Sequence, residues 1–153
     1  IRGSRKNGIE NVILESKMNF RGGYSLADQV ANLVMIRKFT AVFAANDWMA
    51  IGLIQALRTK GIEVPDQVSV LSVDNIPLAS QFAPALTTYS LDANMMIAEC
   101  FSLMDAVESG KGGDMENNAA EERKFHKRII LQPILITRDT LKKREDPFRP
   151  GCY

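Results

Sequence analysis

The feature that most constrains the fold is a pair of apolar runs separated by one helical pattern, in residues 41–75. Residues 41–45 and 68–73 are short apolar runs of the kind that form buried strands. The intervening apolar residues recur at helical spacing: Met49, Ile51, Leu53, Ile54 and Leu57. Polar residues that suit a helix start, Asn46 and Asp47, precede this pattern. Gly61 and Pro65 follow it and favour its end. The segment therefore predicts strand, helix and strand.

Two polar pairs follow the two predicted strands. Asn46-Asp47 comes after the first strand and Asp74-Asn75 after the second. Because parallel strands place their carboxyl ends at one edge of a sheet, and ligands bind at that edge, these side chains are candidate binding residues. Aromatic rings such as those of Trp48 and Phe20 could pack on a sugar or purine ring. For Trp48, a place in the core or at an interface remains the alternative.

The rest of the chain predicts further strands and helices around this segment. Apolar runs at 11–15 and 129–137 suggest strands, and Pro133 favours an edge position for the later one. Ser25 is expected to begin a helix that reaches Lys38, with residues 17–23 as a loop before it. Asp92 is expected to cap a helix that runs to residue 109, and residues 112–122 are expected to be a mobile polar segment. Alternating strands and helices with short connections predict an α/β fold, a parallel sheet flanked by helices.

Composition sets limits on the class of protein. With 153 residues, of which 46% are hydrophobic, the chain can bury one core. Its net charge of +1 does not indicate a nucleic-acid surface on this chain. Cys100 and Cys152 form neither a metal motif nor a disulfide framework, which suggests a reducing, cytoplasmic location. No apolar stretch approaches the roughly 20 residues of a membrane span.

Catalytic and metal-binding interpretations are weaker than structural ones. Asp47 and Asp74 could form a catalytic pair, but single carboxylates at strand ends are more often caps or hydroxyl ligands. His126 is the only histidine and lies in the basic run 123–128, where a solvated surface is the simpler interpretation. We therefore expect no enzyme activity, no metal and no cofactor.

Four motifs together resemble the lactose/galactose repressor family of bacterial transcription regulators. They are the segments Phe43–Gly52, Gly61–Val70, Asp74–Ala79 with Pro84–Thr88, and Ile130–Arg138, in the family's order and spacing. The resemblance implies a periplasmic-binding-protein-like (type I) fold of two α/β lobes that close around a small effector. It implies that residues 9–140 are an incomplete effector-binding domain. They would form the second lobe (the C-terminal subdomain), with helix 92–109 crossing toward the first lobe. Residues 1–8 and 141–153 would be tails.

The resemblance also assigns roles to individual residues. Asn46 and Asp74 match family positions that bind effector hydroxyls or ring polar atoms, and Asp47 and Trp48 adjoin them. Phe20 matches the family's site aromatic if a short deletion precedes Gly23; strict spacing would instead select Met18. Arg5 matches an effector-binding arginine by its Arg-x-x-Gly form. Leu91 stands where sugar-responsive members often have a polar residue.

The family also forms homodimers. The matching residues here are Ile51, Gln55, Gln81 and Phe82. We therefore expect a ligand-sensing part of a repressor that responds to a sugar-like or nucleoside-like effector. Operator DNA would be bound only through a helix-turn-helix outside this chain. A sugar-binding protein of a bacterial transporter, which shares the fold, is the alternative.

Overall fold

The computed structural model describes residues 2–6, 9–109 and 129–143. The chain divides into two compact units, residues 1–90 with 135–153, and residues 91–134. We call the first the sheet unit and the second the α5 unit, and describe each by itself. Most of the predicted strand and helix pattern falls in the sheet unit.

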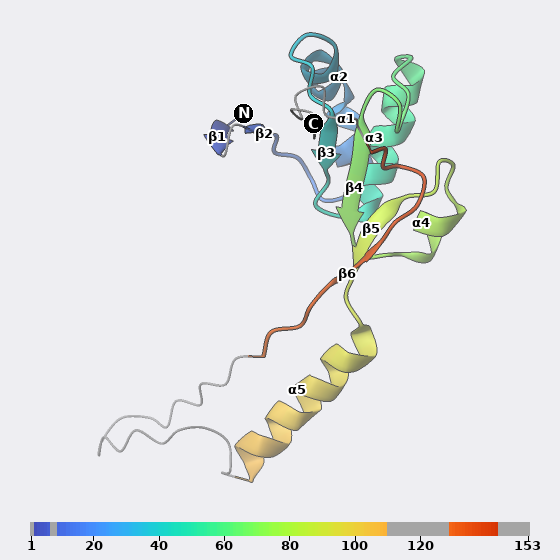
Figure 1. Ribbon diagram of the computed structural model, residues 1–153. Coiled ribbons are helices and arrows are strands. Elements are labelled where there is room, and N and C mark those ends of the chain that lie inside the picture. Colours follow the sequence, from blue (N-terminus) through green and yellow to red (C-terminus); the bar gives the residue numbers. More distant parts are fainter. Residues whose placement is uncertain (1, 7–8, 110–128, 144–153) are drawn as a thin grey trace, which may run out of the picture. The chain divides into compact units, whose positions relative to one another are not determined.

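A four-stranded sheet organises the sheet unit. Its order is β3 (Ala41–Phe43), β4 (Ser69–Val73), β5 (Thr87–Ser90) and β6 (Ile134–Ile136). The pairs β3–β4 and β4–β5 are parallel, so the predicted parallel α/β sheet is confirmed. β6 lies at the sheet edge, as Pro133 suggests. Figure 1 shows these strands, with α3 running alongside β4.

Helices pack on this sheet mainly through α3 (Asp47–Thr59), which contacts β4, α1 (Phe20–Ser25) and α2 (Ala27–Met35). The Asn46 side chain accepts from the Met49 amide at 2.9 Å and so caps α3. Gly61 follows the helix with φ of +70°, a left-handed conformation that glycine adopts without penalty. The predicted start and end of this helix are confirmed.

The core lies between α3, α2 and the sheet. Its largest fully buried apolar side chains are Leu57, Leu86, Val68 and Val70. α1 and α3 approach closely because both helices carry glycine at the crossing. A Cβ at Gly52 would lie 2.1 Å from the Phe20 carbonyl oxygen, and one at Gly23 would lie 1.9 Å from that of Met49. The sequence Gly22-Gly23 thus serves helix packing as well as local conformation.

Three predictions about the N-terminal third are wrong. Residues 2–6 are not a tail: β1 (Arg2–Lys6) pairs antiparallel with β2 (Ile9–Ile13). A two-stranded ladder depends on backbone groups, which leave no apolar periodicity in the sequence. Residues 17–23 are not all loop, since α1 begins at Phe20 with its cap at Asn19. Ser25 does not cap a helix; it ends α1, and its hydroxyl donates to the Gly22 carbonyl at 2.9 Å.

Two further elements differ from prediction, one in its existence and one in its extent. Helix α4 (Pro77–Gln81) was not predicted, and the predicted strand 129–137 is reduced to β6. The predicted mobile segment 112–122, the basic run 123–128 and Cys152 lie outside the described residues.

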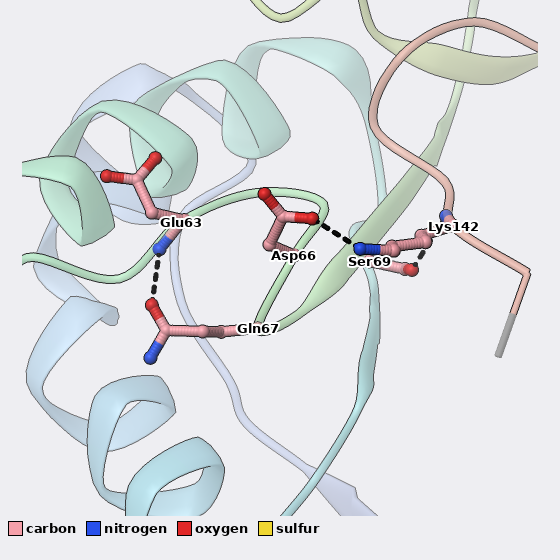
Figure 2. A network of polar contacts seen from close by, with 5 residues as sticks. All are labelled: Glu63, Asp66, Gln67, Ser69 and Lys142. Atoms are coloured by element: carbon pink, nitrogen blue, oxygen red, sulfur yellow. Dashed lines mark hydrogen bonds and ion pairs between the residues drawn. The ribbon is translucent and has the colours of Figure 1, made fainter.

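The segment after β6 is bound to the sheet unit. Thr140 is fully buried; its carbonyl accepts from the Val70 amide and its hydroxyl from the Thr87 amide, both at 2.8 Å. Further along, Lys142 pairs with Asp66 at 2.6 Å and its amide donates to Ser69 Oγ at 3.2 Å (Figure 2). The hydrogen bond and charge of Lys142 lower the pKa of the Asp66 carboxyl. Residues 140–142 are thus bound to β4, to β5 and to the loop before β4.

The α5 unit contains α5 (Ala93–Glu108), whose start is capped by Asp92 as predicted. No residue of α5 is buried, and its exposed apolar side chains include Met95, Met96, Ile97, Phe101, Met104 and Val107. No helix in the described part of the chain is long and apolar enough to cross a membrane.

Candidate functional site

Asn46 and Asp74 stand at the same edge of the sheet. β3 and β4 are parallel neighbours in which Phe43 pairs with Leu71. Asn46 lies three residues beyond Phe43, and Asp74 lies three residues beyond Leu71. The two residues therefore follow adjacent parallel strands at the carboxyl edge of the sheet, which we call the rim.

Asn46 is held by both ends of its amide group. Its Oδ1 caps α3, and its Nδ2 donates to the Met18 carbonyl at 3.1 Å. The side chain is half-buried. The same residue thus fixes the helix start and the loop that precedes α1. This anchoring places the Met18 backbone next to the rim.

Asp74 lies in a turn with unusual backbone angles. Asp74 and Asn75 have φ of +119° and +54°, in a region that L-residues rarely adopt. The Asp74 amide donates to the Tyr89 carbonyl at 2.9 Å, and the Asn75 amide donates to Thr88 Oγ1 at 3.3 Å. The Asp74 side chain is exposed. Desolvation, and then the charge of Asp47, raise the pKa of its carboxyl.

Asp47 is a buried hydrogen-bond acceptor and not, as the sequence suggests, an effector-binding residue. Its side chain is 0% exposed. Oδ1 accepts from Ser72 Oγ at 2.5 Å and from Thr88 Oγ1 at 2.7 Å, and Oδ2 accepts from the Ile76 amide at 2.8 Å. With both oxygens bound inside the protein, Asp47 is placed to hold α3, β4, β5 and the Asp74–Asn75 turn together. The structure presents no Asp47 surface to an effector.

The predicted aromatic residues and Met18 lie on or close in sequence to the loop before α1 and the start of α3. Phe20 is half-buried and stacks on Tyr24, with ring centroids 6.3 Å apart. Trp48 is 46% exposed, so it is not a core residue. Met18, the alternative to Phe20, is also exposed. The helical start that follows Asn19 makes Phe20 the first residue of α1 rather than a loop residue.

The remaining predicted residues fall elsewhere. Arg5 lies in β1, and its side chain is outside the described part of the structure. Ile51 is 2% exposed and belongs to the core, which corrects the expectation that it contacts a second subunit. Gln55 and Gln81 are exposed, whereas Phe82 is half-buried and packs against the core. Leu91 is exposed in the α5 unit.

Two cavities of the sheet unit do not include the rim residues Asn46 and Asp74. One cavity of about 300 Å³ lies between the end of α3 and residues 83–84, and another of about 810 Å³ lies between β2, α2 and β3. Neither is lined by Asn46 or Asp74. Among the described residues, no group of three or more His, Cys, Asp and Glu could hold a metal ion.

Sequence reasoning missed the residues that support the rim. Ser72 lies between Leu71 and Val73 in β4, and Thr88 lies between Thr87 and Tyr89 in β5; both are fully buried. Arg138 donates to the Leu86 carbonyl at 2.7 Å and to Asn75 Oδ1 at 2.8 Å. A polar residue between two apolar ones was the available signal for Ser72, whereas Thr88 stands in a largely polar strand that gives no such signal. Nothing in the sequence pairs Arg138 with Asn75, 63 positions away.

Comparisons with known proteins agree with this architecture. The model of the periplasmic binding protein-like domain matches residues 2–141. The HTH-type transcriptional repressor PurR of Vibrio parahaemolyticus is 35% identical over 134 residues, covering 88% of this chain and 36% of the relative. The HTH-type transcriptional regulator DegA of Bacillus subtilis is 33% identical over 84% of this chain and 34% of the relative. The chain thus spans about a third of the length of these relatives.

Solved structures of bacterial transcription regulators are also similar to this chain. The Escherichia coli transcriptional repressor ascG is similar with a TM-score of 0.63 and 32% identity, over 82% of this chain and 41% of that one. A sugar-binding transcriptional regulator of the LacI family from Escherichia coli, complexed with phosphate, has a TM-score of 0.61 and 30% identity. It aligns over 82% of this chain and 40% of its own.

Proposed function

Since this chain belongs to the periplasmic-binding-protein-like domain family, in its LacI/GalR-type group, we propose that it is the ligand-sensing part of a bacterial transcription regulator. The observation on which the proposal depends is the rim: Asn46 and Asp74 follow adjacent parallel strands at matching positions. In open α/β sheets this edge is where ligands bind. The Asp74 carboxylate is exposed there, while Asn46 fixes the neighbouring loop.

The rim suits a small ring compound with several hydroxyl or amide groups. The carboxylate of Asp74 accepts hydrogen bonds, and an exposed indole such as Trp48 offers a flat apolar surface to a sugar or base ring. Met18 is bound next to the rim through the Asn46–Met18 hydrogen bond, and Phe20 follows two residues later at the start of α1. We therefore propose a sugar-like or nucleoside-like effector, with Arg5 as a further ligand residue.

The same proposal covers the partners of the whole protein. A regulator of this kind acts in the cytoplasm as a homodimer and binds operator DNA through a separate helix-turn-helix. Gln55, Gln81 and Phe82 are the proposed dimer residues that retain exposed surface. The named relatives are repressors or regulators rather than transport proteins, which favours the regulator over a transporter's sugar-binding protein. Those relatives are also not enzymes.

A thermal-shift panel on the full-length protein tests the proposed function. The probes are lactose, cellobiose, nucleosides and purine bases, each titrated to high concentration. A ligand present at 100 times its Kd stabilises the folded state by about 2.7 kcal/mol, which raises Tm measurably. The proposal is contradicted if no probe of these classes shifts Tm.

Variants then locate the site. Asp74→Asn should abolish the shift produced by the active probe, because it removes the carboxylate charge from the rim. Asn46→Asp retains a side chain that caps helices well but loses the Nδ2 donor, so it should weaken the shift. Asp28→Asn is the matched control, since Asp28 is an exposed carboxylate on α2 that pairs with Lys60. Equal losses in all three variants would place the ligand elsewhere.

A further inference from the structure

The Asp74–Asn75 turn is held in place by tethers from several elements. Two successive residues with positive φ form a conformation that costs free energy and persists only when the surroundings impose it. The backbone amides of 74, 75 and 76 donate to Tyr89, Thr88 and Asp47, respectively. These three bonds fix the backbone of the turn.

The Asn75 side chain has a separate tether, which comes from the C-terminal segment. Its Oδ1 accepts from the Arg138 guanidinium at 2.8 Å, and a second guanidinium nitrogen donates to the Leu86 carbonyl at 2.7 Å. The guanidinium is thus fixed by two acceptors at once, and hydrogen bonds from charged donors are the stronger kind. Arg138 is half-buried, which limits competition from water.

The backbone around Arg138 is equally well fixed. Its amide donates to Thr87 Oγ1 at 2.8 Å, and the Asp139 amide donates to the Ala85 carbonyl at 2.9 Å. The Ala85 amide in turn donates to Asp139 Oδ2 at 3.2 Å. A side chain that starts from such a rigid backbone loses little further freedom when it binds Asn75. Arg138 is therefore well prepared to impose a conformation on the turn.

We propose that Arg138 is a positioning residue for the rim, which fixes the Asp74–Asn75 turn through Asn75 and so sets how Asp74 is presented to a ligand. Its consequence for binding rests on the proposed function, but its effect on the turn does not. Arg138 touches no ligand in this role. It connects the segment by which the chain re-enters the sheet unit to the turn that follows β4.

Amide hydrogen exchange, measured residue by residue by NMR on the full chain, tests this role without any ligand. Arg138→Met retains the apolar stem and removes both guanidinium bonds. The amides of 74, 75 and 76 should then exchange about tenfold faster or more, the effect of losing a hydrogen bond from a charged group. The amides of α3 should be unchanged. Arg138→Lys, with one compact donor, should restore part of the protection.

Two further variants separate positioning from general stability. Lys142→Met removes the ion pair with Asp66 on the same segment and should leave the turn amides unchanged. Asn75→Gly keeps the positive φ accessible and removes the acceptor, so adding Arg138→Met to it should change turn exchange by less than twofold. If Arg138→Met itself fails to fold, Asn75→Gly alone must accelerate exchange of the turn amides.

The outcomes distinguish the two proposals. Uniform acceleration in α3 and the turn, or no acceleration in the turn, would overturn the positioning role of Arg138. Localised acceleration with no response to lactose, cellobiose, nucleosides or purine bases would support the positioning role and contradict the proposed function. If a probe binds, Arg138→Met should weaken its affinity while Lys142→Met does not.

Discussion

The hydroxyl of Thr88 lies 2.7 Å from Oδ1 of Asp47, and this hydrogen bond joins β5 to the first turn of α3 inside the protein. Ser72 binds the same carboxylate oxygen from β4. Three elements that are distant in sequence thus meet at one buried carboxylate. The Ile76 amide, bound by the other oxygen, extends the connection to the rim turn.

Replacing Asp47 should destabilise the fold strongly. Asp47→Ala leaves the donors of Ser72, Thr88 and Ile76 without their acceptor, and each unsatisfied buried group costs about 1–3 kcal/mol. We expect a loss of about 3 kcal/mol or more in the free energy of unfolding, measured by urea denaturation. Asp92→Ala, which removes an exposed helix cap, is the control and should cost about 1 kcal/mol. Equal costs would show that the buried network contributes little.

Gly52→Ala should also destabilise, although alanine favours helices. The added Cβ would lie 2.1 Å from the Phe20 carbonyl oxygen, so α1 and α3 would have to move apart. Overpacking of this kind costs typically about 1–3 kcal/mol, more than the gain of roughly 1 kcal/mol in helix propensity. The control is Gly61→Ala, where no atom lies within 4 Å and only the positive φ is penalised. A Tm for Gly52→Ala at or above that of the parent chain would argue against close helix packing.

The raised pKa of Asp74 predicts a stability change with a definite sign. The folded state favours the protonated carboxyl of Asp74. The contribution of Asp74 to the free energy of unfolding is therefore fully present below its unfolded pKa, and it is lost as pH rises through the folded pKa. Asp74→Asn should therefore unfold at an equal or higher urea concentration than the parent at pH 7. This advantage should vanish below about pH 3.8, the ordinary value of this carboxyl. If Asp74→Asn is less stable than the parent at pH 7 and equally stable at low pH, the pKa of Asp74 is lowered by folding and this prediction is wrong.

If the proposed dimer forms, a charge added at Gln55 should weaken association, whereas a charge added elsewhere on the surface should not. Gln55 is exposed on α3, so Gln55→Arg should leave the fold intact and place two like charges near a symmetric interface. Sedimentation velocity should then show a shift toward monomer. Gln29→Arg, an exposed change on α2, should leave the profile unchanged. Association unaffected by Gln55→Arg would remove this face from the interface.

The elements that were predicted correctly are those whose sequence signal lies within the element itself. Apolar runs at 41–45 and 68–73 predict β3 and β4, but only β4 is the buried strand that such a run favours. β3 lies at the sheet edge with Ala41 and Phe43 exposed, so its expected place inside the sheet is wrong. Asn46 and Asp92 were found as caps because a capping side chain binds amides two or three residues ahead, within its own sequence neighbourhood. The α1 helix and strand β1 were missed, because their patterns are short and their stability comes from contacts with α3 and β2.

Local patterns in the sequence are enough to predict the parallel α/β architecture. They also predict that Asn46 and Asp74 share one edge of the sheet, because each follows an apolar run that forms a strand. The folded structure is needed to show that Asp47 is a buried acceptor, that Ile51 belongs to the core, and that Arg138 binds Asn75. Burial and side-chain pairing depend on segments far apart in the chain. Their approach in space is set by packing, which no local pattern of residues records.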